Sequence, residues 1–226
     1  MTAISVQVHF QIEIDFLVEN SFRPTFTYRD ESVHQSTSKI DVSSNRKSRK
    51  WSASELARRV LWELAQPVFR LSLRQFWSFR TVLLRLFGAR IGQHVHIFPT
   101  VRITVPWNLT IGDNSAIGDC AILYALGPIT IGERATISQY AHLCAGSHDF
   151  RRNTMDLIKP PIEIGNDAWI CTDAFVGPNV RIGSRVVVGA RAVVTKDIMD
   201  DTIVAGNPAK PIGTREIFST YNSCSE

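Results

Sequence analysis

The feature of this sequence that most restricts its fold is an aliphatic residue that recurs every six positions from Ile91 onward. The recurring residues are Ile91, Ile97, Ile103, Leu109, Ile111, Ile117, Leu123, Ile129, Ile131, Ile137, Leu143, Ile164, Ile170, Val176, Ile182, Val188 and Val194. Eight of the thirteen glycines come directly after such a residue, and a small residue commonly stands four after it. A repeat of this regularity predicts a solenoid, in which each short unit is stable only when stacked on its neighbours.

A six-residue period has a direct physical interpretation as a prism wound from short strands. One aliphatic side chain per repeat points to the axis, and Gly and small residues let the backbone turn at the corners. Three repeats make one coil, so residues 91–212 predict an all-β, parallel β-helix of about five coils. Shifts of two residues at Leu109/Ile111 and Ile129/Ile131 lengthen the coils there from 18 to 20 residues. Parallel crossovers are normally right-handed, and the spacing alone does not oppose that rule.

The rest of the chain divides by composition. Residues 1–50 are polar and irregular after Asn20, which predicts a disordered N-terminal extension without a function of its own. Residues 51–88 carry apolar residues at roughly helical spacing and end at Gly88, which predicts a cap of two amphipathic helices. The repeat domain then occupies residues 89–215, and a C-terminal tail follows at 216–226.

The net charge of +4 is concentrated in residues 46–90, where eleven Lys and Arg stand against two Glu and give a local charge of +9. One interpretation is that Trp62, Phe69, Phe76 and Trp77 pack the helices across the open end of the prism. The other is that this cationic hairpin contacts an anionic membrane near a lipid-linked substrate, and the two roles are compatible. No nucleic-acid binding motif accompanies the charge, so nucleic acid is a poor candidate partner.

The cysteines and the first residues of the chain are typical of a protein of a reducing compartment. Cys120, Cys144, Cys171 and Cys224 show neither paired spacing nor a CxxC motif, which is typical of free thiols in a reducing environment. The first 22 residues lack a basic beginning and a small-residue cleavage site, so no signal peptide is expected. No apolar run reaches the roughly 18 residues of a membrane-spanning helix. We therefore expect a cytoplasmic protein, with peripheral contact at the inner face of the membrane as an additional hypothesis.

His148 is the strongest catalytic candidate in the chain. It stands five residues after Leu143, where the repeat stops, and the non-repetitive segment DFRRNTMDLIKPP follows directly after it. We therefore expect it at an outward corner beside an external loop. An imidazole has a pKa near neutrality, so it can take a proton from a hydroxyl group that acts as a nucleophile. His96 and His142 occupy the same position relative to the repeat, so spacing alone does not single out His148.

Four segments carry a resemblance to a known family: RTVLLRLFGARIGQHVHIFPTVRITVPWNLTIGDNSAIGD, ISQYAHLCAGSHDF, IEIGNDAWI, and VVTKD with VAGNPAKPI. Together they closely resemble hexapeptide-repeat acetyltransferases of the colanic-acid-biosynthesis type and, more distantly, galactoside, maltose and nodulation acetyltransferases. The resemblance implies a left-handed β-helix and a homotrimer with a groove between neighbouring subunits. It also implies direct acetyl transfer from acetyl-CoA to a sugar hydroxyl of an exopolysaccharide or its lipid-linked precursor, with no metal and no covalent enzyme intermediate.

The resemblance assigns catalytic roles to two residues, and a third is a candidate because it stands next to one of them. The GSHD motif makes His148 the general base. Thr172 matches a position whose backbone N–H stabilises the tetrahedral oxyanion. Asp149 is a weaker candidate, because it is either an orienting partner of the imidazole or an ordinary surface carboxylate.

Five residues match positions that contact the acetyl-CoA in this family: Trp169, Thr172, Ala190, Thr195 and Lys210. Lys210 would meet the phosphates of the nucleotide, for which a lysine is a point-charge partner. The alternatives are a packing role for Trp169 and a solvated side chain for Lys210. The family often has a further basic residue where this chain has Gly213, and Arg215 is a candidate substitute.

Two alternatives to an acetyltransferase remain open from the sequence. A γ-class carbonic anhydrase uses the same prism with three histidines on zinc, and His96, His142 and His148 are available. Its two nearby ligands normally have four residues between them, whereas five separate His142 from His148, and GSHD is absent from that class. A non-enzymatic repeat scaffold would keep the aliphatic repeat but would need neither the interrupting segment nor AGNPAKP.

Overall fold

The computed structural model describes residues 39–48 and 50–217. The chain divides into the units Met1–Lys39 and Ile40–Glu226, and every element discussed below belongs to the second unit. Residues 1–38 of the predicted extension and 218–226 of the predicted tail lie outside the described residues.

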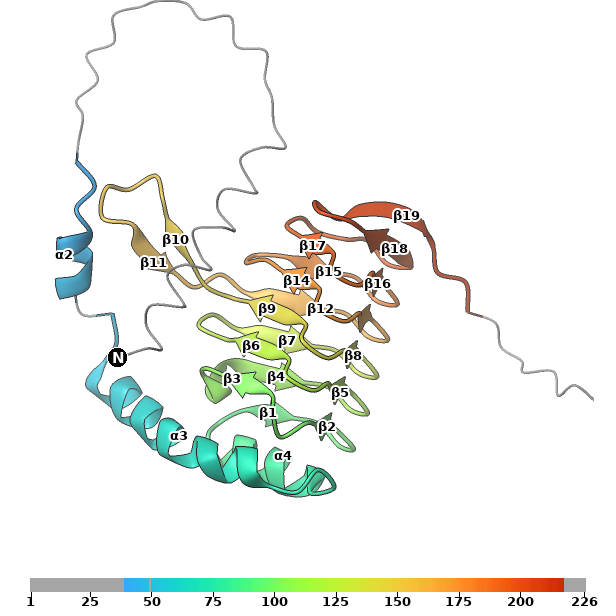
Figure 1. Cartoon of the computed structure of the whole chain (residues 1–226), viewed down its shortest axis with the longest axis horizontal. Helices are drawn as coiled ribbons and strands as arrows, with labels where there is room; N and C mark the ends of the chain where they lie inside the picture. The colour runs from blue at the N-terminus through green and yellow to red at the C-terminus, as the bar shows by residue number, and fades with distance from the viewer. Residues whose placement is uncertain (1–38, 49, 218–226) are drawn as a thin grey trace, which may run out of the picture. The chain divides into compact units, whose positions relative to one another are not determined.

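Three parallel sheets form the faces of a prism, and each coil visits them in the order A, B, C (Figure 1). Sheet A contains β1 (Arg90–Ile91), β4 (Leu109–Ile111), β7 (Ile129–Ile131), β12 (Ile162–Ile164) and β15 (Arg181–Ile182). Sheet B contains β2 (His96–Ile97), β5 (Ala116–Ile117), β8 (Thr136–Ile137), β13 (Trp169–Ile170), β16 (Val187–Val188), β18 (Thr202–Ala205) and the antiparallel β19 (Lys210–Thr214). Sheet C contains β3 (Arg102–Ile103), β6 (Ile122–Tyr124), β9 (His142–Cys144), β14 (Phe175–Val176) and β17 (Val193–Val194). We name each corner A/B, B/C or C/A, after the two sheets that it joins in chain order.

The repeating aliphatic residues stack on one another along the axis of the prism. Ile91 pairs with Ile111, and Ile111 pairs with Ile131, so the first coils repeat every twenty residues. Ile164 pairs with Ile182, so the later coils repeat every eighteen. These side chains are buried in one continuous core. The predicted fold, an all-β parallel β-helix preceded by a helical cap, is confirmed.

The corners turn through a different residue from the one that the sequence suggests. Left-handed backbone occurs three residues after the aliphatic position, for example at Asn114 (φ 59°) and Arg134 (φ 53°). The glycine directly after the aliphatic residue lies instead where successive coils come close, because a Cβ on Gly112 would be 2.6 Å from the backbone nitrogen of Glu133. The prediction that glycine turns the corners is therefore wrong, and its role at Gly112 is to permit close stacking of coils.

The differences in length between coils are concentrated at the C/A corner. In the first coil the 3₁₀ helix η1 (Pro106–Asn108) lies there, between β3 and β4. In the third coil the chain leaves the prism at this corner and forms a hairpin of β10 (Ser147–Asp149) and β11 (Asp156–Ile158) (Figure 1). The predicted external loop is thus an antiparallel hairpin that projects from the coils.

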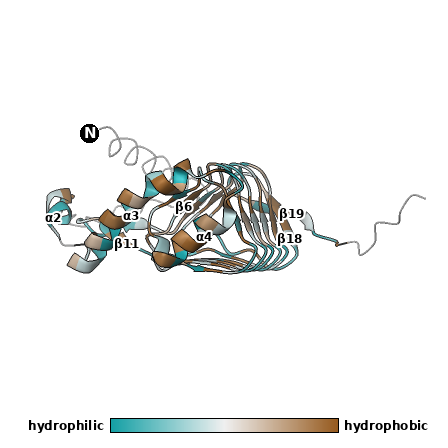
Figure 2. Ribbon diagram, turned by 90° about the horizontal axis from the view of Figure 1, so that it is seen from below, coloured by the Kyte–Doolittle hydropathy of each residue, from teal (hydrophilic) through white to brown (hydrophobic). Residues whose placement is uncertain are grey.

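Two helices cover the open end of the first coil, α3 (Ala53–Leu71) and α4 (Trp77–Leu86) (Figure 2). Trp62 and Phe69, each 1% exposed, join the core of the prism, and Trp62 Nε1 donates a hydrogen bond to the Ile103 carbonyl at 2.8 Å. Pro67 lies inside α3, and Gly88 ends α4 in a left-handed conformation (φ 90°). Through these contacts the helical segment caps the open end of the first coil. None of the helices within residues 39–48 and 50–217 has the length and apolar character needed to cross a membrane.

Arg80 joins both cap helices to the first coil. Its buried guanidinium donates to the carbonyls of Leu73 (2.8 Å) and Arg74 (2.6 Å), just beyond the end of α3, and to the carbonyl of Ile97 in β2 (2.6 Å). The Leu73 carbonyl also accepts from the Phe76 N–H at 3.0 Å, so Arg80 adds a second hydrogen bond there and supplies a partner for the Arg74 carbonyl. Burial lowers the pKa of Arg80 below its ordinary value, because desolvation disfavours the charged form.

A short helix lies within the segment that the sequence predicts to be disordered. Helix α2 (Val42–Lys47) is capped by Asp41, whose carboxylate accepts a hydrogen bond from the Ser44 N–H at 3.0 Å. Asn45 of this helix is buried against the β10–β11 hairpin, 109 positions further along the chain at Thr154. The prediction of disorder throughout residues 1–50 is therefore wrong for this helix, because its stabilising contacts are remote in sequence.

Replacement of Gly127 by Ala is expected to destabilise the protein by about 1–3 kcal/mol, as overpacking typically does. A Cβ at this position would lie 2.5 Å from the carbonyl oxygens of both Lys159 and Pro160, where the chain returns from the hairpin. The free energy of unfolding, measured by chemical denaturation, tests this. Gly213→Ala is the matched control, since its Cβ would meet only Ile203 Cδ1 at 3.9 Å. Equal stability of the two variants would contradict the prediction.

Candidate functional site

The site begins with the β10–β11 hairpin at the C/A corner. Its strands pair His148 with Leu157 and Asp149 with Asp156, so the predicted catalytic residue lies in the middle of a short antiparallel ladder. The hairpin leaves the prism directly after β9, whose Leu143 is completely buried. A rigid coil therefore anchors the strand that carries His148.

The imidazole of His148 is held by a backbone carbonyl. His148 Nδ1 lies 2.7 Å from the carbonyl oxygen of Met155, and a carbonyl can only accept a hydrogen bond. Nδ1 therefore carries the proton, and Nε2 is left with its lone pair. Among the described residues the ring of His148 forms its hydrogen bond through Nδ1 and not through Nε2. This is the tautomer that a general base requires, with the basic nitrogen available to a bound hydroxyl group.

Asp149 does not orient the imidazole. Its carboxylate accepts a hydrogen bond from the Arg151 N–H at 3.1 Å and lies 3.4 Å from Arg152 Nε. Neighbouring side chains on a β-strand point to opposite faces, so Asp149 faces away from the ring of His148. The orienting group is the Met155 carbonyl, which sequence reasoning missed because a backbone acceptor leaves no signal in the residue type.

His142 has a different environment from His148. Its ring packs edge-on against Phe175 with 5.4 Å between centroids, and its Nε2 is buried without a hydrogen-bond partner among the described residues. Burial lowers the pKa of His142 to about 4, because desolvation disfavours the imidazolium. His142 is therefore neutral and packed into the wall of the prism near neutral pH.

The three histidines considered for a zinc site lie in three separate environments. His96 stacks on Trp77 of the cap with 4.8 Å between ring centroids, His142 packs against Phe175, and His148 is bound to Met155. Across the part of the chain that the structure describes, no three His, Cys, Asp or Glu side chains gather in a group that could hold a metal ion. The ligand set of a γ-class carbonic anhydrase is thus not assembled within this chain.

Three of the predicted cofactor residues lie on sheet B and the B/C corner. Trp169 lies on β13, is 46% exposed and donates from Nε1 to Ser138 Oγ at 2.9 Å. Thr172 donates from Oγ1 to the Gln139 carbonyl of the preceding coil at 3.0 Å, and its own carbonyl accepts from the Arg191 N–H of the next coil at 3.0 Å. Ala190 precedes Arg191 and is exposed on the same corner.

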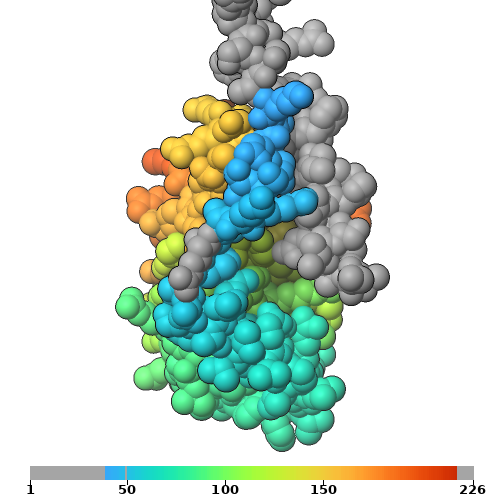
Figure 3. All heavy atoms as spheres, turned by 90° about the vertical axis from the view of Figure 1, so that its left-hand side faces the viewer, coloured from blue at the N-terminus to red at the C-terminus, as the bar shows by residue number. Residues whose placement is uncertain are grey.

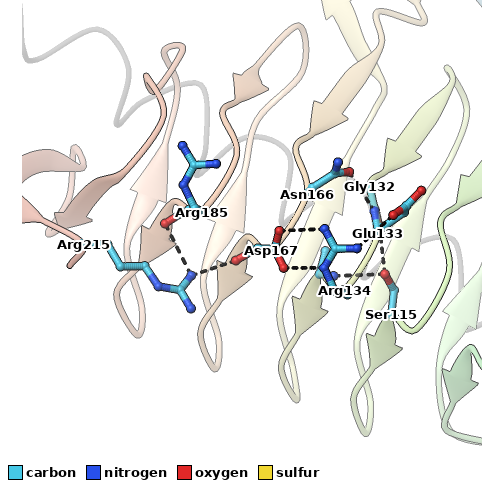
Figure 4. A network of polar contacts seen from close by, with 9 residues as sticks. Ser115, Gly132, Glu133, Arg134, Asn166, Asp167, Arg185 and Arg215 are labelled. Atoms are coloured by element: carbon cyan, nitrogen blue, oxygen red, sulfur yellow. Dashed lines mark hydrogen bonds and ion pairs between the residues drawn. The ribbon is translucent and has the colours of Figure 1, made fainter. Parts of the chain in front are cut away.

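The remaining predicted residues are distributed elsewhere. Thr195 is exposed at the C/A corner directly after β17, and Lys210 is exposed at the start of β19. Arg215 donates to the carbonyls of Asp167 (2.7 Å) and Arg185 (3.4 Å) at the A/B corner (Figure 4). Arg215 is therefore bound to the backbone on a different corner from Thr172, which argues against the phosphate-binding role predicted for it.

The same A/B corner carries ion pairs between successive coils (Figure 4). Arg134 makes two hydrogen bonds to the carboxylate of Asp167, at 2.7 and 2.9 Å, and Arg185 pairs with Asp201 one coil further on. The hydrogen bonds from Arg134 lower the pKa of Asp167 below its ordinary value, and those from Arg185 do the same for Asp201. These groups satisfy one another and serve the stacking of coils.

A single chain does not bring the predicted site residues together. His148 lies on a hairpin from the C/A corner, whereas Thr172 and Ala190 lie on the B/C corner, and sheet C separates the two corners. An apolar groove on the cap is lined by Trp51, Leu56 and Leu61 and includes none of these residues. The predicted site residues are therefore divided between two corners of the prism.

The fold and the repeat define a class of protein, and comparison with known proteins identifies it. The family "Bacterial transferase hexapeptide (six repeats)" matches residues 161–196. "Putative colanic acid biosynthesis acetyltransferase WcaF" of Escherichia coli (strain K12) is 46% identical over 154 residues, which are 68% of this chain and 85% of that protein. The chain belongs to the hexapeptide-repeat acetyltransferases.

Solved structures of two acetyltransferases share the fold. A hexapeptide-repeat containing acetyltransferase from Vibrio cholerae O1 biovar eltor, complexed with acetyl coenzyme A, is 29% identical with a TM-score of 0.67, over 74% of this chain and 91% of that chain. A maltose O-acetyltransferase from Clostridium difficile 630 is 25% identical with a TM-score of 0.66, over 74% of this chain and 90% of that chain. These similarities favour an acetyltransferase over both the carbonic anhydrase and the scaffold alternative.

Replacement of His142 by Phe is expected to flatten the dependence of stability on pH. In the folded protein the pKa of His142 lies near 4, below its ordinary value of 6.5, so the unfolded chain binds the proton more tightly. The neutral His142 therefore stabilises the fold fully above pH 6.5. As the pH falls from 6.5 to about 4, the free energy of unfolding decreases by on the order of 3 kcal/mol. Denaturant unfolding across this range measures the loss, which the His142→Phe variant should lack.

His94→Asn is the matched control for this measurement. His94 is exposed and has left-handed backbone (φ 53°), which Asn tolerates. The control should keep the pH dependence of the wild-type protein. If the His142→Phe variant lost stability on acidification as steeply as the wild type, burial of a neutral His142 would be excluded as the cause.

Proposed function

We propose that this chain transfers the acetyl group of acetyl-CoA to a hydroxyl group of a sugar, with His148 as the general base. The observation that carries the proposal is the hydrogen bond from His148 Nδ1 to the Met155 carbonyl, which leaves Nε2 free to accept a proton. The acceptor class is supported by the names of the relatives, a colanic acid biosynthesis acetyltransferase and a maltose O-acetyltransferase. The substrate proposed is therefore an exopolysaccharide or its lipid-linked precursor.

The reaction needs only positioning and proton transfer from the protein. The hydroxyl oxygen of the sugar attacks the carbonyl carbon of the thioester while Nε2 of His148 takes the hydroxyl proton. The tetrahedral intermediate collapses as the C–S bond breaks, and the imidazolium returns its proton to the departing sulfur of CoA. The products are an acetyl ester of the sugar and free CoA, and no acyl-enzyme forms.

The oxyanion of this intermediate requires a donor that is not already used. Within the described residues the backbone N–H of Thr172 makes no hydrogen bond, although those of Cys171 and Asp173 on either side bind to neighbouring coils. A free N–H at a rigid corner is a preorganised donor for developing negative charge. The corresponding corner residue Ala190 also has an unused N–H, so the family match is what selects Thr172.

The coenzyme would extend along the later coils from Thr172. Trp169 is exposed enough to cover part of the pantetheine arm, and its Nε1 bond to Ser138 fixes the orientation of the ring. Ala190 and Thr195 would border the path, and the exposed Lys210 would meet a phosphate group as a point charge.

The assembly that we propose is a homotrimer. His148 and Thr172 must both lie within about 3 Å of the reacting group, and they lie on different corners of one prism. A head-to-tail contact between copies places the C/A hairpin of one subunit against the B/C corner of the next. Such a contact uses two different surfaces of the chain. Repeated from copy to copy, it gives a closed ring when the rotation between neighbouring copies is a whole fraction of 360°. Three copies of a three-sided prism meet this condition and give three equivalent sites.

Contact of the cap with an anionic membrane surface is supported by exposed apolar side chains, of which Phe76, at 53% exposed, is the one expected from the sequence. Trp62 and Phe69 are buried in the cap, so they are not available to lipid. An outward stripe on α3 is exposed and apolar instead (Figure 2), and it consists of Leu56, Val60, Leu64, Val68 and Leu71. Its exposed basic neighbours, such as Arg70, would favour anionic headgroups. Contact of this kind would bring a lipid-linked acceptor close to the enzyme.

Replacement of His148 by Ala should lower turnover at least about a hundredfold, because a general base typically contributes 10² to 10⁴ in rate. The affinity for acetyl-CoA should remain, since the residues proposed to bind it lie on other coils. Mass-detected acetylation of a panel of free, nucleotide-linked, lipid-linked and polymeric glycans measures the turnover. The same panel identifies the acceptor with the wild-type enzyme.

His142→Ala is the matched comparison, because His142 occupies the same position in its repeat and is packed against Phe175. It should lose far less turnover than His148→Ala. Native mass spectrometry should give three chains for the wild type and for both variants. A greater loss of turnover for His142→Ala, or near-normal turnover of His148→Ala, would show that His148 is not the general base.

For the membrane contact, the full chain should bind vesicles that contain anionic lipid, and binding should weaken with salt. Joint replacement of Leu64 (71% exposed) and Leu71 (84% exposed) by Ser should weaken binding about tenfold or more, because each leucine contributes roughly 1.5–3 kcal/mol on burial. Met199→Ser, an exposed apolar residue on the later coils, is the control. Binding that ignored lipid charge and salt would contradict the proposal.

A further inference from the structure

Helix α2 and its cap bind the connection between the two strands of the catalytic hairpin. The backbone N–H of Asp41 donates to the carbonyl of Asn153 at 2.8 Å. The side-chain amide of Asn45 donates to the carbonyls of Thr154, at 2.5 Å, and Met155. Three successive carbonyls of the hairpin thus accept hydrogen bonds from residues 41–45. Figure 3 shows α2, in blue, lying against the hairpin, in yellow.

Asn45 is the buried part of this contact. It is 6% exposed, whereas its neighbours on α2 are exposed, so the helix presents one polar side chain to the hairpin. A buried amide is costly unless its donors are satisfied, and here Nδ2 finds two carbonyl acceptors. The ion pairs of the hairpin itself involve Arg152, which is 68% exposed, and exposed pairs restrain a loop weakly. Within the turn the Met155 N–H donates to the Arg152 carbonyl at 3.0 Å, and α2 adds the hydrogen bonds that hold the carbonyls of residues 153–155.

The carbonyl of Met155 connects Asn45 to the proposed base. This oxygen accepts one hydrogen bond from Asn45 Nδ2 and one from His148 Nδ1. A carbonyl has two lone pairs, so both bonds can form together. Met155 also has left-handed backbone (φ 48°), which is uncommon for a residue of this kind and needs support from its surroundings. The direction of its carbonyl decides which nitrogen of His148 carries the proton.

We propose that Asn45 is a positioning residue for His148, which fixes the Met155 carbonyl and through it the tautomer and orientation of the imidazole. The proposal rests on the function of His148 as the general base. It gives the N-terminal segment a part in catalysis at a distance, since Asn45 touches neither the imidazole nor the substrate. Its effect therefore falls on the chemical step rather than on the binding of acetyl-CoA.

The test uses the full chain with Asn45→Ala and, as the matched control on the same helix, the exposed residue Arg46→Ala. Asn45→Ala should lower kcat about tenfold or more while the KM for acetyl-CoA changes less than about twofold, because small misplacements of a catalytic group are costly. Asn45→Asp should lose more, since a carboxylate oxygen would face two carbonyl oxygens. Arg46→Ala should behave as the wild type.

A second readout does not depend on turnover. Nitrogen NMR of ¹⁵N-histidine-labelled protein reports the tautomer of His148, whose signals are assigned by their loss in His148→Ala. The wild type should show Nδ1 protonated and Nε2 unprotonated, and Asn45→Ala should shift the ring toward a mixture of tautomers. Melting temperature, measured alongside, separates positioning from loss of the fold.

The outcomes separate this inference from the proposed function. Wild-type kcat together with an unchanged tautomer in Asn45→Ala would overturn the positioning role, as would a fall in kcat that only followed a fall in stability. A shifted tautomer in Asn45→Ala would uphold the restraint on the ring even if the wild-type protein acetylated no glycan. In that case the proposed function alone would fail.

Discussion

The structure depends on the in-register stacking of one aliphatic side chain per strand along the axis of the prism. Ile117 lies between Ile97 and Ile137 in sheet B, and all three are completely buried. Each coil hydrogen-bonds in parallel to the next, so no coil is stable alone and the order of the stack is cooperative. The close approach of coils requires glycine where a side chain would strike the next backbone, as at Gly112. Helices α3 and α4 then cover the first coil, which would otherwise expose its core.

A β-helix of this kind accommodates extra residues at its corners, and in this acetyltransferase the extra residues lie mainly at one corner. The C/A corner absorbs the additional residues of the first coils and the whole β10–β11 hairpin without disturbing the sheets. His148 is thereby carried outside the prism on a strand whose base is rigid. The hydrogen bond to Met155 then gives its imidazole a defined tautomer. The core that stabilises the fold and the histidine that we propose as the general base thus lie in different parts of one chain.

The separation of the corners also bears on assembly. The residues that we propose to meet at the thioester, His148 and Thr172, lie on opposite edges of sheet C. A prism has no concave interior in which they could converge, because its axis is filled with aliphatic side chains. The proposed site between copies would resolve this geometry, and it would leave the cap end of each prism free for the proposed membrane contact.

The sequence by itself determined the fold, the length of each coil and the corner that carries His148. These follow from a local rule, since the six-residue period states which side chains face the axis wherever it occurs. The sequence did not determine which partner orients His148, because it offered Asp149 only as a weak candidate and held no signal for the carbonyl of Met155. It also gave no sign that Asn45 would bind residues 154 and 155. The contacts of Asn45 join segments more than a hundred positions apart, and both they and the His148 contact end on backbone carbonyls, so only the tertiary structure reveals them.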